Sequence, residues 1–191
     1  MTYKHLSFVS LFAVAALSAS AQRNVENFNF GWQFHRGNID VAAINTSDGS
    51  WETINVPHDF QISQPWVAPA ANETEDNSDG ASNFKSRLSA RGFKEMGDGW
   101  YVKTYTPAAD MKGRRILLDF EGIMYVGDVY LNGKRIGGTD YGYLGFDIDV
   151  SKLLKYGQAN TIAVHASTSG PLNSRWYTGG GLYRDVKIVS T

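Results

Sequence analysis

Residues 172–181 bring together the side-chain types best suited to bind a polar ligand. Asn173, Ser174 and Arg175 offer hydrogen-bonding groups, and an aromatic pair and three glycines follow them. Arginine presents a planar fork of donors, and glycine lets a backbone approach its neighbour closely because it lacks a Cβ atom. These residues are therefore the first candidate binding site, and Arg175 is its leading member. A surface salt bridge is the alternative role of Arg175.

A second candidate consists of His58 and Asp59, which directly follow Pro57. The chain is predicted to leave a strand here and to enter a loop. Loop residues held by a rigid scaffold often carry function. His58 and Asp59 could therefore contact a substrate, or they could form a hydrogen-bonded structural corner.

Two further residue pairs have less specific surroundings. Tyr141 and Tyr143 flank a glycine, so they could stack on a sugar face or pack at the edge of a sheet. Arg184 and Asp185 lie just before the last predicted strand. They are expected to form a structural pair.

The sequence offers few candidates for catalytic residues. The chain has no Cys and no G-x-S-x-G, Walker, H-E-x-x-H or G-x-G-x-x-G motif. His35, His58 and His165 are scattered, so we expect neither a metal site nor a cofactor. We expect His165 to be a surface residue or a half-buried one with its hydrogen bonds satisfied. A retaining glycosidase needs two carboxylates about 5 Å apart. None of the six Glu residues lies in a recognisable catalytic context, so no catalytic residue is predicted.

Composition indicates a globular all-β domain. The chain has 191 residues, of which 42% are hydrophobic and 19% are charged, which suits one domain rather than a disordered protein. The 18 Lys and Arg residues nearly balance the 19 Asp and Glu residues, which argues against nucleic acid or an anionic membrane as a partner. The 13% aromatic content and 20 Gly favour an all-β protein with flat side chains in its core or on sugars.

The first 21 residues are predicted to be a secretory signal peptide. Lys4 gives the charged start, residues 6–17 form an apolar stretch too short to span a bilayer, and Ala19 and Ala21 fit a small-x-small cleavage site. Cleavage after Ala21 would leave residues 22–191 as one exported domain, in the periplasm or outside a bacterial cell. An N-terminal anchor helix is the alternative.

Apolar residues alternate along most of the remaining chain, which predicts about eight short strands. One predicted strand places Phe28, Phe30, Trp32 and Phe34 on a single apolar face; others cover residues 100–106, 116–120, 125–131, 162–166 and 186–188. Asn132-Gly133 predicts a tight hairpin, because both turn positions must tolerate a positive φ. Only residues 151–156 have a helical pattern. The expected fold is an all-β sandwich of jelly-roll type with little helix.

Residues 68–99 differ from the rest, because Asn, Asp, Ser, Glu and Gly dominate them. A loop of this length within a compact domain is usually functional or disordered. The segment could be a solvated surface insertion, or it could shape a binding site.

Seven short motifs occur in a specific order along the chain. They are NFGWQF (29–34), VPHDF (56–60), GWYVKTY (99–105), FEGI (120–123), VYLNG (129–133), GYLGFDI (142–148) and RWYTGGGLYRDV (175–186). Each motif alone is weak, but the series closely resembles the N-terminal sugar-binding domain of glycoside hydrolase family 2, especially its bacterial β-galactosidases. The resemblance covers almost all of residues 24–191 and implies a galactose-binding-like β-sandwich.

The resemblance implies a retaining glycosidase that acts on a β-galactoside-like carbohydrate. In the family this jelly roll precedes an immunoglobulin-like domain and a (β/α)8 barrel, and the barrel carries the catalytic Glu pair. The immunoglobulin-like domain and the barrel are absent from these 191 residues, so the chain alone is expected to be inactive. A residue before the Gly-x-Tyr-Arg element, often Asp, reaches the active site in related enzymes; by position it falls at Asn173–Arg175, where there is no Asp.

Three functions therefore remain open. The chain could be the non-catalytic domain of such a glycosidase, where it would wall the active site of the barrel. It could be a stand-alone secreted carbohydrate-binding module without hydrolase activity, or a β-sandwich scaffold that binds other proteins.

Overall fold

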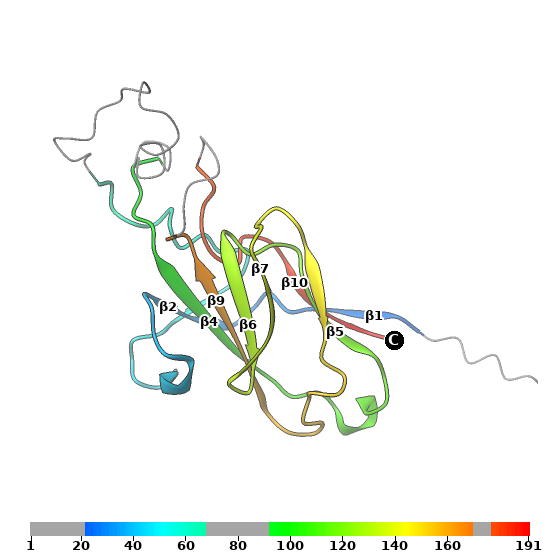
Figure 1. Cartoon of the computed structure of the whole chain (residues 1–191). Coiled ribbons are helices and arrows are strands. Elements are labelled where there is room, and N and C mark those ends of the chain that lie inside the picture. Colours follow the sequence, from blue (N-terminus) through cyan, green and yellow to red (C-terminus); the bar gives the residue numbers. More distant parts are fainter. Residues whose placement is uncertain (1–21, 68–91, 170–176) are drawn as a thin grey trace, which may run out of the picture.

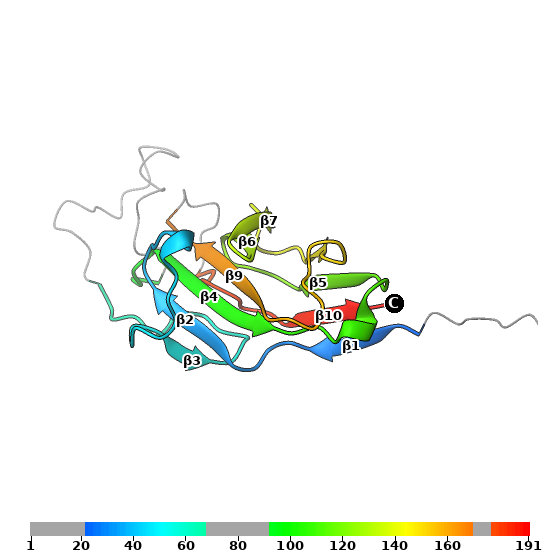
Figure 2. The ribbon, with the colours of Figure 1, turned by 90° about the horizontal axis from the view of Figure 1, so that it is seen from below.

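The computed structural model describes residues 22–67, 92–169 and 177–191. The predicted signal peptide and most of the polar segment 68–99 lie outside these residues. Two antiparallel sheets pack face to face (Figure 1 and Figure 2). The all-β jelly-roll sandwich expected from the sequence is confirmed. No helix in the described ranges is long and apolar enough to cross a membrane.

The smaller sheet has the strand order β1-β10-β5-β8, and the larger has the order β3-β2-β4-β9-β6-β7. The strands of the smaller sheet are β1 (Asn24–Asn27), β5 (Ile116–Phe120), β8 (Phe146–Asp149) and β10 (Val186–Ser190). Those of the larger sheet are β2 (Trp32–Arg36), β3 (Glu52–Ile54), β4 (Asp98–Tyr105), β6 (Val126–Leu131), β7 (Lys134–Thr139) and β9 (Asn160–Ser167). Two short 3-10 turns, η1 (Val41–Ala43) and η3 (Ala109–Met111), complete the described elements.

The core lies between the two sheets, as the alternating sequence pattern predicts. In β5, Ile116, Leu118 and Phe120 are fully buried while the residues between them are partly exposed. Trp32 from β2 and Ile162 from β9 face them across the interface within the same apolar cluster. Burying each such side chain contributes about 1.5–3 kcal/mol, so these inward faces hold the sandwich together.

The hairpin predicted at Asn132-Gly133 joins β6 to β7. Asn132 and Gly133 have φ values of 51° and 81°. The Asn132 side chain accepts a hydrogen bond from the backbone N–H of Thr161 and donates one to Asn160, both at 3.0 Å. The turn is therefore tied to the neighbouring strand β9.

The single strand predicted through Phe28 and Phe34 is wrong. The chain pairs with the smaller sheet as β1, turns at Gly31 with φ 73°, and joins the larger sheet as β2. Phe30 is exposed, whereas Phe28 and Phe34 are buried. Because the chain changes sheets at this turn, alternation does not continue through it.

The helix predicted over residues 151–156 is also wrong, because these residues form turns. Asp149 caps the first turn by accepting a hydrogen bond from the backbone N–H of Ser151 at 3.1 Å. The side-chain amide of Asn160 then accepts a hydrogen bond from the backbone N–H of Lys155 and donates one to its backbone C=O, each at 2.9 Å. Those two bonds occupy backbone groups that a continuing helix would need.

One end of the sandwich collects the segments that carry the candidate residues. It is the end where β2 and β9 finish and where β4 and β6 begin. We call it the loop end; among the described residues it comprises 56–67, 92–97, 121–125, 140–145, 168–169 and 177–185.

Candidate functional site

The middle of the loop end is a short backbone ladder. The N–H groups of His58 and Phe60 donate to the carbonyls of Leu182 and Gly180, at 2.7 and 2.9 Å. On the other side of the same segment, the N–H of Met124 donates to the carbonyl of Gly181 at 2.8 Å. The glycine-rich motif is therefore clamped between two neighbouring segments.

The Asp59 carboxylate uses both of its oxygens within the chain. Oδ1 accepts the backbone N–H groups of Gln61 and Gly180, each at 2.9 Å, and Oδ2 accepts the Tyr177 hydroxyl at 2.8 Å. Burial and this hydrogen bond to Asp59 raise the pKa of Tyr177. The geometry is that of a structural corner, one of the two roles considered for Asp59. Its contact with a substrate stays a prediction.

His58 faces the interior of the sandwich. Its Nδ1 lies 2.9 Å from the Tyr101 hydroxyl, and its ring centroid lies 4.8 Å from that of Phe34. Burial lowers the pKa of His58, because a charged imidazolium would lose its hydration there. A neutral His58 fits this apolar environment, and its predicted contact with a substrate is not tested by the structure.

The three glycines of the motif allow close packing against the chain itself. A Cβ on Gly181, which has φ 114°, would lie 2.1 Å from the Tyr101 hydroxyl oxygen. A Cβ on Gly180 would lie 2.7 Å from a methyl carbon of Thr168. The sequence suggested that these glycines let the backbone approach a ligand. In the structure, Gly180 and Gly181 instead let the backbone approach other residues of the same chain.

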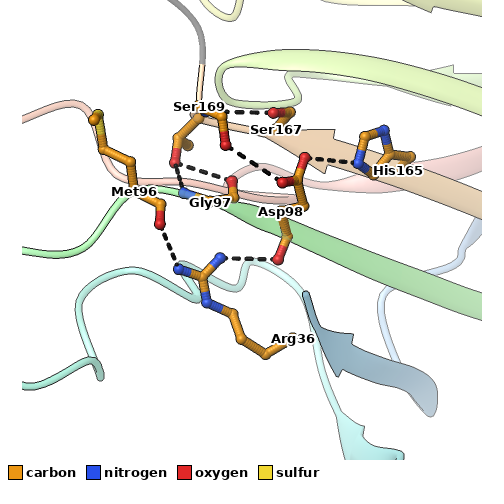
Figure 3. A network of polar contacts seen from close by, with 8 residues as sticks. Arg36, Met96, Gly97, Asp98, His165, Ser167 and Ser169 are labelled. Atoms are coloured by element: carbon orange, nitrogen blue, oxygen red, sulfur yellow. Dashed lines mark hydrogen bonds and ion pairs between the residues drawn. The ribbon is translucent and has the colours of Figure 1, made fainter. Parts of the chain in front are cut away.

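A second polar network surrounds Asp98, at the first residue of β4 (Figure 3). The Asp98 carboxylate contacts Nε2 of His165 at 2.9 Å and accepts the Ser169 hydroxyl at 3.3 Å. Arg36 donates to the carbonyls of Asp98 and Met96, at 2.8 and 2.9 Å. The network ties the start of β4 to the end of β9.

The order of groups in this network does not match a nucleophilic triad. In a triad the histidine lies between the nucleophile and the acid, whereas here the carboxylate of Asp98 lies between Ser169 and His165. Burial lowers the pKa of Arg36, and the neighbouring charge of Asp98 opposes this effect. The network therefore serves to fix the loop end. The half-buried, hydrogen-bonded state expected for His165 is observed.

Sequence reasoning missed the parts played by Arg36 and Asp98. Both lie at strand ends, where an ordinary alternating pattern gives no reason to single them out. In the structure, Gly97 has φ 150°, and a Cβ there would lie 2.7 Å from an Arg36 nitrogen, so the glycine makes room for the arginine.

The remaining sequence candidates fall into two groups. Asn173, Ser174 and Arg175 lie outside the described residues. Arg184 and Asp185 bind separate partners: Asp185 accepts the Asn29 amide at 3.0 Å, and the Arg184 guanidinium lies 5.1 Å from the ring centre of Tyr183. The expected Arg184–Asp185 pair is therefore replaced by two separate contacts.

Two antiparallel sheets with a glycine-rich loop end define the class of protein as a jelly-roll β-sandwich. Residues 87–173 match the family model described as glycosyl hydrolase 2 galactose-binding domain-like. The chain belongs to glycoside hydrolase family 2, and it is the galactose-binding-like N-terminal domain of that family.

Curated relatives agree with this assignment. A β-galactosidase of Bacteroides ovatus, BoGH2A, is 30% identical over 94% of this chain and 19% of its own length. A β-glucuronidase of Formosa agariphila is 32% identical over 87% of this chain and 17% of its own length. The chain thus spans less than a fifth of either relative. The names of the two relatives differ in the sugar, since one is a β-galactosidase and the other a β-glucuronidase.

A solved structure supports the fold independently. The β-glycosidase of Bacteroides vulgatus is 30% identical, with a TM-score of 0.72, over 88% of this chain and 20% of that protein. The similarity again covers only a small part of the longer protein.

Proposed function

We propose that this chain is the sugar-binding domain of an exported, retaining β-glycosidase, with a β-galactoside-like substrate. The observation that carries the proposal is the match of nearly the whole chain to one domain of larger β-galactosidases and β-glucuronidases. The domain helps to wall the active site, and the catalytic Glu pair lies on the barrel of the complete enzyme. We also propose that residues 1–21 are removed as a signal peptide during export. Neither nucleic acid nor a membrane is proposed as a partner.

Within this function, Arg175 is the leading substrate-binding residue. Asn173 and Ser174 are its neighbours in sequence, and Tyr177, two residues later, is held by Asp59. Arginine can donate paired hydrogen bonds to sugar hydroxyls. Bonds that strengthen as the oxocarbenium-like transition state forms raise the rate of hydrolysis.

The test uses the complete enzyme, identified by sequencing the DNA that follows the codon for Thr191. Arg175→Ala should lower kcat/KM for a nitrophenyl β-galactoside by about 10- to 150-fold, because a charged hydrogen bond contributes about 1.5–3 kcal/mol. Asn173→Ala should act more weakly in the same direction. Arg184→Ala is the matched control and should leave kcat/KM nearly unchanged, since the Arg184 side chain contacts Tyr183 and the Glu121 carbonyl.

Three outcomes would contradict parts of the proposal. The first is an unchanged kcat/KM in Arg175→Ala, which would remove this residue from the site. The second is hydrolysis by the purified 191-residue chain that is abolished by changing one of its own Glu residues. A mature protein that still carries residues 1–21 would contradict export.

A further inference from the structure

A polar cavity lies on the outer face of the larger sheet, away from the loop end. It has a volume of about 260 Å³, and its lining residues are Gly31, Gln33, Thr46, Val102, Lys103 and Thr104. Strand β4 begins at the loop end with Asp98 and reaches the cavity near its other end. Pockets for drug-sized ligands measure about 300–1,000 Å³, so this cavity suits a smaller ligand with a single ring.

Strand pairing directs three of the lining side chains to one face. Gln33 of β2 pairs in register with Val102 of β4, and Thr104 follows two residues later. Residues two apart in a strand share a face, and directly paired residues do too. Val102 belongs to the small apolar cluster around Trp100, whereas its neighbour Tyr101 lies in the core between the sheets. The cavity therefore has an apolar floor at Val102, with an amide and a hydroxyl beside it.

The neutral polar groups of the cavity retain bonding capacity for a ligand. The Gln33 amide donates one hydrogen bond, to the Thr53 hydroxyl at 2.9 Å. A side-chain amide has a second donor and an acceptor oxygen. Within the described part of the chain, the hydroxyls of Thr46 and Thr104 have no hydrogen-bond partner. Each hydroxyl can donate one bond and accept two, which matches the hydroxyls of a sugar.

Lys103 is the one charged residue among those that line the cavity, and its ammonium is already bound. Nζ donates to the carbonyls of Phe28 and Phe30, at 3.0 and 2.7 Å, and lies 3.7 Å from the centre of the Phe28 ring. Because successive residues of a strand point to opposite faces, the Lys103 side chain leaves the face that Val102 and Thr104 share. The cavity thus offers no free cation to a uronate or a phosphate.

An exposed aromatic side chain adjoins the cavity along the chain. Phe30 directly precedes Gly31 and is 64% exposed. The turn that carries it is fixed, because the Gly31 N–H donates to the side-chain oxygen of Asn55 at 3.0 Å. No atom lies within 4 Å of the position that a Cβ on Gly31 would occupy, so this side of the cavity is open. Aromatic and apolar walls with a few polar groups are typical of small-molecule sites.

We propose that this cavity binds one neutral sugar ring of a glycan. The hydroxyls of the sugar bond to Gln33, Thr46 and Thr104, and its C–H face packs on Val102 and Phe30. The site goes beyond the proposed function, which puts the substrate contacts at residues 173–175, and it is built from described residues of this chain alone. In a complete glycosidase, a second contact with the same glycan would raise the overall affinity for a polymer; this consequence alone rests on the proposed function.

The experiment titrates the 191-residue chain with methyl β-galactoside and follows its backbone amide signals by NMR. Signals of residues 31–33, 46 and 102–104 should shift with a Kd on the order of 1–10 mM, because one sugar ring has few atoms to contribute. Methyl β-glucuronide should bind at least about fivefold more weakly, since its carboxylate would lose hydration without gaining a cation.

Variants make the test specific. Thr104→Val and Gln33→Leu each remove hydrogen bonds to the sugar and should raise Kd by about 2- to 12-fold. Phe30→Ala should also raise Kd, because the aromatic contact is lost. Thr161→Val is the matched control: Thr161 is exposed and pairs with Thr104 in the next strand, but it does not line the cavity. Its Kd should equal that of the unaltered chain, and equal melting temperatures would show that all four variants fold.

Several results would overturn the site. One is the absence of saturable shifts at the cavity with about 100 mM sugar, well above the expected Kd range. Another is a set of shifts confined to the loop end. Unchanged Kd values in both Thr104→Val and Gln33→Leu, or an equal loss in Thr161→Val, would do the same. Equal binding of methyl β-glucuronide would overturn the assignment to a neutral sugar.

The outcome for the proposed function is read separately. Hydrolysis by the complete enzyme and its Arg175→Ala variant tests that function, whereas the titration needs neither the barrel nor catalysis. Binding at the cavity without hydrolysis by the complete enzyme would contradict the proposed activity and support this site.

Discussion

The Tyr177 hydroxyl donates a 2.8 Å hydrogen bond to the carboxylate of Asp59, 118 residues earlier in the chain. The same carboxylate accepts the backbone N–H of Gly180. One side chain thus holds the glycine-rich segment at two points on either side of Thr178 and Gly179. Asp59 therefore helps to hold the described part of the glycine-rich segment in place.

Replacement of Asp59 should show how much this corner contributes. Asp59→Ala should lower the free energy of unfolding by about 1.5–3 kcal/mol, because charge-assisted bonds are lost and the Gly180 N–H is left without its acceptor. Tyr177→Phe removes one bond only and should cost about 0.5–1.5 kcal/mol. Urea unfolding of the isolated chain measures both values. Equal stability of Asp59→Ala and the unaltered chain would show that the corner is dispensable.

The close packing of the glycine-rich segment predicts a strong effect at Gly181. Gly181→Ala combines a positive φ with a Cβ that would lie 2.1 Å from the Tyr101 hydroxyl oxygen. We expect the free energy of unfolding to fall by at least about 3 kcal/mol, because backbone strain and overpacking act together. Gly133→Ala is the matched control: its φ is also positive, but no atom lies within 4 Å of the added Cβ. It should cost only about 1–2 kcal/mol. Similar losses in the two variants, read from thermal melting, would contradict the packing argument.

Burial of His58 predicts a pH dependence of stability. Because its folded pKa is lowered, the unfolded chain takes up a proton first as the pH falls. The contribution of neutral His58 is therefore complete above its ordinary pKa of 6.5 and is lost as the pH falls below that value toward the folded pKa. His58→Gln should flatten the stability profile between roughly pH 7 and 5. Denaturant midpoints across this range are the measurement. An unchanged slope in His58→Gln would contradict this account.

The polar segment that follows Trp66 should be removable. Its described ends already lie together, since Trp66 bridges to Lys94 and the Val67 N–H bonds the Phe93 carbonyl at 2.8 Å. Joining residues 68 and 91 with a short Gly-Ser linker should therefore shift Tm by less than about 4 °C. In the complete enzyme, an unchanged kcat/KM would favour a surface insertion, and a large loss would favour a segment that shapes the binding site.

Local patterns determined much of the fold. Alternation along β5 placed Ile116, Leu118 and Phe120 in the core, because a strand exposes successive side chains to opposite faces. Asn132-Gly133 specified its hairpin, since few residue pairs accept two successive positive φ values. The order of seven short motifs likewise indicated family 2, which the comparisons show.

Other features depended on residues distant in the sequence. Phe30 continues the apolar alternation but is exposed, because the chain changes sheets at Gly31. Residues 151–156 have a helical pattern, but the Asn160 amide occupies the backbone groups of Lys155. Arg36, Asp98 and His165 come together only because β2, β4 and β9 are neighbours in one sheet. The sequence by itself determined most of the strands that it predicted, the hairpin and the family. Tertiary structure decided where the chain changes sheets and which polar groups meet at the loop end, because those features arise from strand pairing between distant segments.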